Sequence, residues 1–218
     1  MTRLPGFILT LALAAAVILS GPAAAQAQLQ EGRDFVTLSP AQPVDAKGKV
    51  EVIEFFSYAC PHCNDFDPIL DKWIKRLPKD VEVRKVPVTF KRAAWANLAK
   101  LYYALDTIGE TGRLHAKVFE AFHAKNVNLG DEKTAMDWAL TQGVDMKKFQ
   151  EAWNGFGMAG RVANGQAMAE AYKIGGVPTL AVAGRYVVVG KAATTYEDLL
   201  RIADALIQRA RNEGLVGK

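Results

Sequence analysis

The chain has 218 residues, half of them hydrophobic and 23% charged, with 27 lysines and arginines against 23 aspartates and glutamates. This composition is typical of a globular protein and excludes a disordered or collagen-like chain. The formal net charge is only +4 and both signs are mixed along the sequence, which argues against a nucleic-acid-binding protein. The length suffices for one sizeable domain, or for one domain that carries an insertion.

The N-terminal residues form a segment of a different kind. Arg3 is followed by an apolar run over residues 7–19, and a string of alanines ends the segment. This pattern predicts a secretory signal peptide over residues 1–25, with cleavage after Ala25 or after Ala27. The apolar run of 13 residues is short against the roughly 20 that a spanning helix needs, which disfavours an uncleaved membrane anchor. Removal of the segment leaves a mature net charge of +3.

A strand, a helix and a second strand follow a polar, extended segment over residues 26–49. Residues 50–56 are mostly β-branched or aromatic and predict a buried strand. Apolar residues recur at helical spacing over 64–77, and residues 81–88 again have strand character. We expect a βαβ unit with parallel strands and a right-handed crossover. Pro68 falls inside the helix and predicts a kink there, with a helix break as the alternative.

The middle of the chain is helical. The predicted helices, separated by short breaks that contain glycine or asparagine, span residues 94–108, 113–125, 131–142, 145–153 and 162–172. No strand pattern interrupts this stretch of about 80 residues.

Strand character returns near the C-terminus. Residues 179–183 and 186–189 predict a hairpin with its turn at Gly184-Arg185, and an amphipathic helix over 195–211 ends the chain. A helical block between two sheet-forming parts predicts an insertion into one α/β domain. The expected domain boundaries follow from this pattern: first part 26–91, inserted helical domain 92–172, second part 173–218.

The two cysteines of the chain, Cys60 and Cys63, stand where the first strand turns into the helix. A structural disulfide is the first interpretation to consider in an exported protein. The spacing argues against it, because closing so short a loop contributes only about 2 kcal/mol before strain is subtracted. A disulfide that stabilises a fold would instead join segments that lie far apart in the sequence.

The position of Cys60 indicates redox chemistry. Cys60 is the expected N-cap and Pro61 the first helical residue, so free backbone N–H groups and the positive end of the helix face the Cys60 sulfur. Such a site favours thiolate over thiol, and His62 is expected to assist. Cys60 is therefore the predicted attacking thiol, and Cys63, one turn further, the buried resolving thiol. Whatever stabilises the Cys60 thiolate also makes the disulfide a stronger oxidant.

A metal site is the alternative from another functional class, since Cys60, Cys63 and His62 supply three potential zinc ligands. Structural zinc usually needs a second pair of ligands, and His115 and His123 lie in a helical stretch without ligand-like spacing. We expect these two histidines to be ordinary helix-surface or core residues. We therefore predict no metal site.

Glu54 is the charged residue of greatest interest in the first strand. It is in phase with Val52 and Phe56, which predicts apolar surroundings, although an exposed strand end is the alternative. A buried carboxylate needs a cationic partner or a raised pKa. Lys85, on the neighbouring strand, is a candidate partner, and an acid near the dithiol would serve as a proton relay during exchange.

Together these features resemble those of a known protein family. Residues 50–63 are similar to the strand and motif of the thioredoxin superfamily, and the Cys-Pro-His-Cys sequence resembles the DsbA type. Residues 176–179 fall where that fold places its cis-proline loop, and the helical block is similar to the inserted domain of DsbA proteins. The resemblance spans the mature chain and implies an α/β, thioredoxin-like fold with an inserted all-helical domain. Pro68 is a departure, since it is more reminiscent of the kinked helix of thioredoxin.

The resemblance also implies roles for residues outside the motif. It implies that Pro178 is cis and close to Cys60, and that Val177 offers backbone hydrogen bonds to a bound peptide. It further implies that Glu54 and Lys85 match the family's buried acid and nearby lysine.

The activity implied by the resemblance is donation of a disulfide to newly exported, reduced proteins in the periplasm. Reoxidation by a DsbB-like membrane partner would follow, and no small-molecule cofactor is required. We expect a monomer. The nearest alternative is an isomerase or reductase of the DsbC type, which normally brings an N-terminal dimerisation domain. Only about 24 residues separate the predicted cleavage site from the first strand here.

Overall fold

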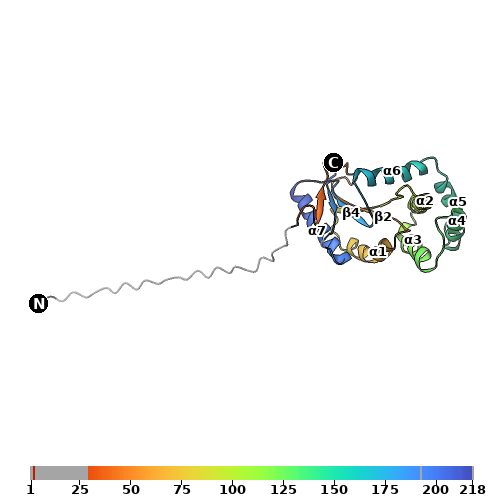
Figure 1. The fold of residues 1–218 in the computed structure, drawn as a ribbon, viewed down its shortest axis with the longest axis horizontal. Helices are drawn as coiled ribbons and strands as arrows, with labels where there is room; N and C mark the ends of the chain where they lie inside the picture. Colours follow the sequence, from red (N-terminus) through yellow and green to blue (C-terminus); the bar gives the residue numbers. More distant parts are fainter. Residues whose placement is uncertain (1, 3–28, 192, 218) are drawn as a thin grey trace.

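The computed structural model describes residue 2, residues 29–191 and residues 193–217, and within these ranges the chain forms a mixed sheet of five strands with helices on both faces (Figure 1). In their order across the sheet the strands are β1 (Phe35–Thr37), β5 (Tyr186–Val188), β4 (Thr179–Val182), β2 (Val50–Phe56) and β3 (Val81–Pro87). β2 and β3 are parallel, as the predicted βαβ unit requires, whereas the other three pairs are antiparallel. All residues of β2 are buried, so this strand forms the centre of the fold.

Two helices cover one face of the sheet and a third covers the other. α1 (Pro61–Ile74) and α7 (Tyr196–Asn212) pack with Val50 and Val52 of β2 in one apolar cluster. α6 (Met158–Ala171) and its C-cap face the opposite side of the same strand. The alternation along β2 therefore directs Glu54, in phase with Val52, toward the α1 side.

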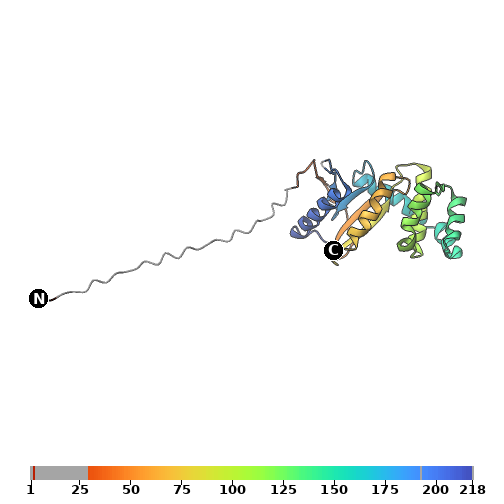
Figure 2. The same ribbon diagram turned by 90° about the horizontal axis from the view of Figure 1, so that it is seen from below.

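The remaining helices gather beyond one end of the sheet (Figures 1 and 2). They are α2 (Ala93–Thr107), α3 (Thr111–Phe119), the π-helical turn η1 (Glu120–Ala124), α4 (Glu132–Thr141) and α5 (Met146–Trp153). Together with α6 they lie between β3 and β4 in the chain. Their apolar core is continuous with Phe56, Tyr58 and Cys63, so the inserted helices pack directly against the cysteine motif.

Capping residues explain why several helices begin where the sequence predicts. Asp131 and Asp145 cap α4 and α5 by accepting hydrogen bonds from backbone N–H groups of the first turn. Thr195 and Asp198 form a capping box at the start of α7. α1 runs unbroken through Pro68, so the helix-break alternative is wrong.

Three local expectations differ from the structure. β1 lies inside the segment expected to be simply extended, because three residues are too few for a periodic pattern and pairing with β5 defines them. α6 begins at Met158, before the predicted residue 162. The hairpin turn is centred one residue earlier than predicted, since Ala183 and Gly184 both have positive φ and Arg185 N–H donates to the Val182 carbonyl at 3.1 Å.

The predicted signal peptide over residues 1–25, with its alternative end at Ala27, lies outside the described residues except for Thr2. Among the residues that the structure does describe, no helix has both the length and the apolar character needed to cross a bilayer. The segment from 29 onward leads into β1 at the edge of the sheet.

Candidate active site

The two cysteines lie at the N-terminus of α1. Cys60 is the N-cap residue with extended backbone, and Pro61 occupies the first turn, as the sequence predicts. The backbone N–H groups of Cys63 and Asn64 both donate to the Cys60 carbonyl at 3.1 Å, which starts the helix. Both cysteines are free thiols, Cys60 being 8% exposed and Cys63 fully buried. An external sulfur can therefore reach Cys60 but not Cys63.

The surroundings of the two cysteines lower the pKa of Cys60 and raise that of Cys63. The pKa of Cys60 is lowered to about 6, chiefly by a hydrogen bond from the Cys63 thiol. Partial burial opposes this shift, whereas the backbone N–H groups of Cys63 and His62 and the charge of His62 add to it. Burial, and secondarily the contact with Cys60, raises the pKa of Cys63. The thiolate of the reduced pair therefore resides on Cys60. The sequence indicated that the helix N-terminus and His62 lower the pKa of Cys60, but the hydrogen bond from the Cys63 thiol lowers it most.

The first testable consequence is the titration of the reduced protein. Thiolate absorbance in the ultraviolet should rise with a midpoint near pH 6, because the pKa of Cys60 lies at about 6. Cys63→Ala should move the midpoint to higher pH, since the donor that stabilises the Cys60 thiolate is removed. Cys60→Ser is the control and should abolish the transition. A midpoint at the ordinary cysteine value of about 8.5 would contradict the site described here.

A proline loop from the other end of the chain packs against Cys60. The Val177–Pro178 peptide bond is cis, as the resemblance implies. The Cys60 thiol donates to the Val177 carbonyl over 3.2 Å, across 117 positions of sequence. The loop immediately precedes β4, the strand next to β2, which explains how two distant segments meet.

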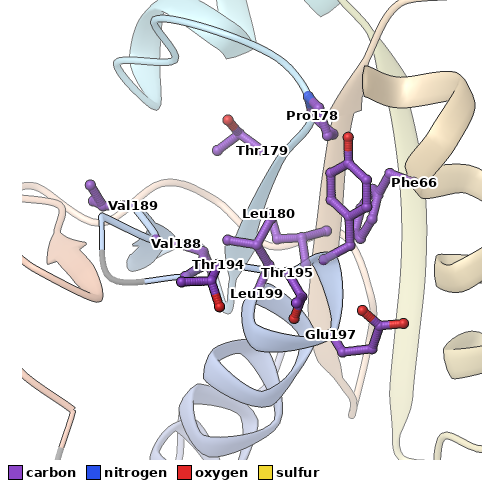
Figure 3. A pocket seen from close by; sticks show the side chains of 13 residues that line it. Phe66, Pro178, Thr179, Leu180, Val188, Val189, Thr194, Thr195, Glu197 and Leu199 are labelled. Atoms are coloured by element: carbon purple, nitrogen blue, oxygen red, sulfur yellow. The ribbon is translucent and has the colours of Figure 1, made fainter. Parts of the chain in front are cut away.

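A pocket of about 620 Å³ opens beside Pro178. Figure 3 shows Pro178 and Phe66 on one side of this pocket and Val188 and Val189 on the other, with the start of α7 below them. The remaining lining residues come from β4, from the loop after β5 and from the first turns of α7: Thr179, Leu180, Gly190, Ala193, Thr194, Thr195, Tyr196, Glu197 and Leu199. The pocket, named here the Pro178 pocket, therefore lies beside the loop whose Val177 carbonyl accepts the hydrogen bond from Cys60.

His62 is exposed and contacts the start of α7. Its Nδ1 lies 3.3 Å from the hydroxyl oxygen of Tyr196, whose ring packs on Phe66 with centroids 5.3 Å apart. Tyr196 therefore links the cysteine motif to the Pro178 pocket. The sequence carried no signal for this contact, because Tyr196 lies 134 residues from His62.

Glu54 and Lys85 form a buried ion pair. Glu54 is 1% exposed, and Lys85 Nζ lies 2.8 Å from its Oε2. The two residues face each other across the parallel β2–β3 ladder, so the strand register brings them together. Lys85 Nζ also lies 2.8 Å from Oδ1 of Asp67, a residue of α1 that the sequence analysis did not single out. Its position, one helical turn after Cys63, is the signal that would have found it.

Both histidines of the inserted helices are half-buried, and each makes contacts that the sequence did not indicate. His115 Nε2 lies 3.1 Å from Asp67 Oδ1, and its Nδ1 lies 2.7 Å from the Tyr58 hydroxyl oxygen. His123 Nε2 lies 2.8 Å from the Tyr58 carbonyl oxygen. The polar contacts behind the cysteines therefore extend into the inserted helices.

Comparisons with known proteins agree with this geometry. Residues 51–201, more than half of the chain, match the family model of the DSBA-like thioredoxin domain. Over 205 residues the chain is 38% identical to the thiol:disulfide interchange protein DsbA of Bordetella parapertussis, covering 94% of this chain and 96% of that protein. The chain belongs to the DsbA family.

Solved structures of the DsbA family confirm the fold. DsbA of Pseudomonas aeruginosa superimposes with a TM-score of 0.79 at 34% identity, covering 84% of this chain and 95% of that structure. The oxidoreductase DsbA from Xylella fastidiosa gives 0.77 at 34% identity, covering 84% and 98%. The predicted thioredoxin-like fold with inserted helices is correct, and the chain is a protein thiol-disulfide oxidoreductase.

The alternative function as a zinc site would involve Cys60, Cys63 and His62. Among the residues that the structure describes, no three histidine, cysteine, aspartate or glutamate side chains are grouped so that they could hold a metal ion. Cys60 instead directs its thiol at the Val177 carbonyl.

Proposed function

We propose that this chain is a periplasmic disulfide donor that passes the Cys60–Cys63 disulfide to newly exported, reduced proteins. The observation that carries the proposal is the asymmetry of the pair: the pKa of Cys60 is lowered to about 6, while that of the buried Cys63 is raised. A thiol with a low pKa is a good leaving group, and its stabilised thiolate favours the dithiol form. Both effects favour transfer of the disulfide from the Cys60–Cys63 pair to the client protein.

The exchange proceeds in two displacements. A client thiolate attacks Cys60 Sγ, forming a mixed disulfide while the Cys60–Cys63 bond breaks and Cys63 takes up a proton. A second client thiolate then attacks the client sulfur of the mixed disulfide, and Cys60 leaves as thiolate. Two electrons pass from the client dithiol to the pair, so no small-molecule cofactor is required. A DsbB-like membrane partner would accept these electrons and restore the disulfide.

The residues around the pair have distinct roles in this proposal. Pro61 starts the helix whose N–H groups support the Cys60 sulfur, and His62 adds positive charge beside it. A client segment would lie along Val177 and Pro178 in the manner of an added strand, because backbone groups next to a strand end suit extended peptides. The Pro178 pocket would receive a client side chain.

Equilibration with a glutathione redox buffer tests the donor direction. The reduction potential of the purified protein should lie well above the value of about −270 mV that is typical of thioredoxin. Alkylation of free thiols followed by electrophoresis measures the reduced fraction at each buffer ratio. A potential as reducing as that of thioredoxin would overturn the proposal.

A further inference from the structure

A second cavity lies in the helical part of the molecule, away from the exchange chemistry. It is a groove of about 590 Å³, and α2, the end of α5 and α6 contribute to its walls. Most of its described lining residues are small or apolar, among them Ala96, Trp153, Val162 and Ala163. Cavities of this size, lined mainly by apolar side chains, are typical of sites for small organic molecules. This cavity, the α2–α6 groove, is therefore a candidate binding site.

The α2–α6 groove is separate from the cysteine motif. It shares no lining residue with the Pro178 pocket, and neither cysteine is among the described residues that line it. A molecule bound there would leave Cys60 and the Val177–Pro178 loop free to meet a client. Any role of the groove is therefore distinct from the binding of clients.

The space in the groove comes from short side chains on facing helices. Ala96 lies on α2, and Ala159 and Ala163, four residues apart and so on one face, lie on α6. Trp153, the last residue of α5, is 1% exposed and adds a broad aromatic surface. An apolar chain or ring would find contacts on both helices and on the indole.

The charge of the groove has a single sign. Among the described residues that line it, Lys100 alone carries a charge. Its Nζ lies 4.5 Å from the centroid of the Trp153 ring, so the ammonium stands over the indole face. Its ion pair with Glu132 is long, at 3.8 Å, and the Glu132 side chain is 55% exposed, so this pair holds the lysine only weakly. Lys100 can therefore turn to an anion in the groove.

Trp153 supplies a second donor. An indole N–H can only donate, and Nε1 of Trp153 is buried without an acceptor in the part of the chain that the structure describes. Gln166, in contrast, is engaged at both ends, since it accepts from the Thr89 hydroxyl at 3.0 Å and donates to Glu170 at 3.1 Å. Because the Lys100 ammonium covers the indole, a molecule that draws the lysine aside also uncovers the ring.

We propose that the α2–α6 groove binds a small amphipathic anion, with its carboxylate on the Lys100 ammonium and its apolar body between α2 and α6. A carboxylate only accepts hydrogen bonds, which matches the donors of Lys100 and Trp153. The alanines and Val162 then contact the apolar body. The inference does not depend on the direction of disulfide exchange or on the roles of the two cysteines.

Titration of the ¹⁵N-labelled full-length mature protein with sodium octanoate tests the proposal. Amide signals of α2, the end of α5 and the first half of α6 should shift and saturate, whereas those around Pro178 should stay in place. Octanol has the same chain without the charge, so it should bind at least tenfold more weakly. A charge-assisted hydrogen bond typically accounts for a difference of that size.

Lys100→Gln and Lys125→Gln form a matched pair for this titration. Each variant removes one positive charge from the inserted helices, but Lys125 does not line the groove and is paired with Glu120 at 2.9 Å. Lys100→Gln should weaken octanoate binding about tenfold and leave octanol binding nearly unchanged. Lys125→Gln should bind octanoate as the wild type does. Equal weakening in both variants would indicate general charge attraction and would overturn the proposal.

Ala163→Leu tests the apolar half of the site without removing a charge. Ala163 is exposed on α6 and lines the groove, so a leucine there should fill the groove without disturbing the core. Octanoate should then no longer shift the signals of α2 and α6. Wild-type octanoate binding in Ala163→Leu, equal affinities for octanoate and octanol, or shifts confined to the residues around Pro178 would each overturn the inference.

Discussion

Cys63→Ser is expected to accumulate mixed disulfides with client proteins, whereas Cys60→Ser is expected to form none. Cys60 remains accessible in the first variant and still exchanges with external sulfurs. The thiol that would break the mixed disulfide from within is absent. Well-oriented intramolecular reactions reach effective molarities of about 10⁵ M or more, so external thiols replace Cys63 poorly. Electrophoresis under non-reducing conditions, after rapid alkylation of cell extracts, measures the adducts.

Cys60→Ser is the matched control for this experiment. It retains one cysteine, but that cysteine is fully buried, so external sulfurs do not reach it. Adding dithiothreitol should release every adduct of Cys63→Ser, which shows that the link is a disulfide. Adducts on Cys60→Ser with none on Cys63→Ser would reverse the assignment of attacking and resolving thiols.

The chemistry of the cysteine pair could be predicted from the sequence because it depends on local structure. A strand, a motif and a helix are consecutive in the chain, so the N-cap position of Cys60 and the place of Pro61 follow from neighbours alone. The partnership of Glu54 with Lys85 needed one further step, the parallel pairing of β2 with β3. Such pairing is the expected outcome of a βαβ unit.

The contacts that complete the site could not be predicted in the same way. His115 approaches Asp67 only because α3 packs beside α1, and Tyr196 approaches His62 only because α7 begins beside the motif. Helical periodicity gives the apolar face of each element but not which element that face meets. The dominant influence on Cys60, the Cys63 thiol, is an interatomic contact that spacing alone does not reveal.

Replacing Lys85 with methionine should destabilise the protein by about 3–5 kcal/mol, the cost typical of removing one partner of a buried ion pair. Methionine retains much of the apolar stem, so the lost group is mainly the ammonium. Two carboxylates, Glu54 and Asp67, then face each other with side chains 1% and 9% exposed. Urea unfolding at neutral pH, on the reduced protein, measures the free energy of unfolding.

Lys49→Met is the control for this substitution. The Lys49–Glu82 pair has a similar distance, 2.7 Å, but its side chains are 42% and 48% exposed. Exposed pairs contribute about 1 kcal/mol or less, so Lys49→Met should cost little. Equal losses of unfolding free energy in the two variants would show that the buried Glu54–Lys85–Asp67 cluster stabilises the protein no more than an exposed ion pair does.

The pH dependence of the Lys85→Met variant separates lost charge from lost packing. Without the ammonium, burial and mutual repulsion should disfavour the ionised form of the two carboxyl groups in the folded protein. The penalty is then absent at low pH, where the carboxyl groups are protonated in both states, and it grows as pH rises and they ionise. A packing defect would give the same loss at every pH. Convergence of variant and wild-type stability toward low pH would therefore assign the cost to the unpaired carboxylates beside Cys63.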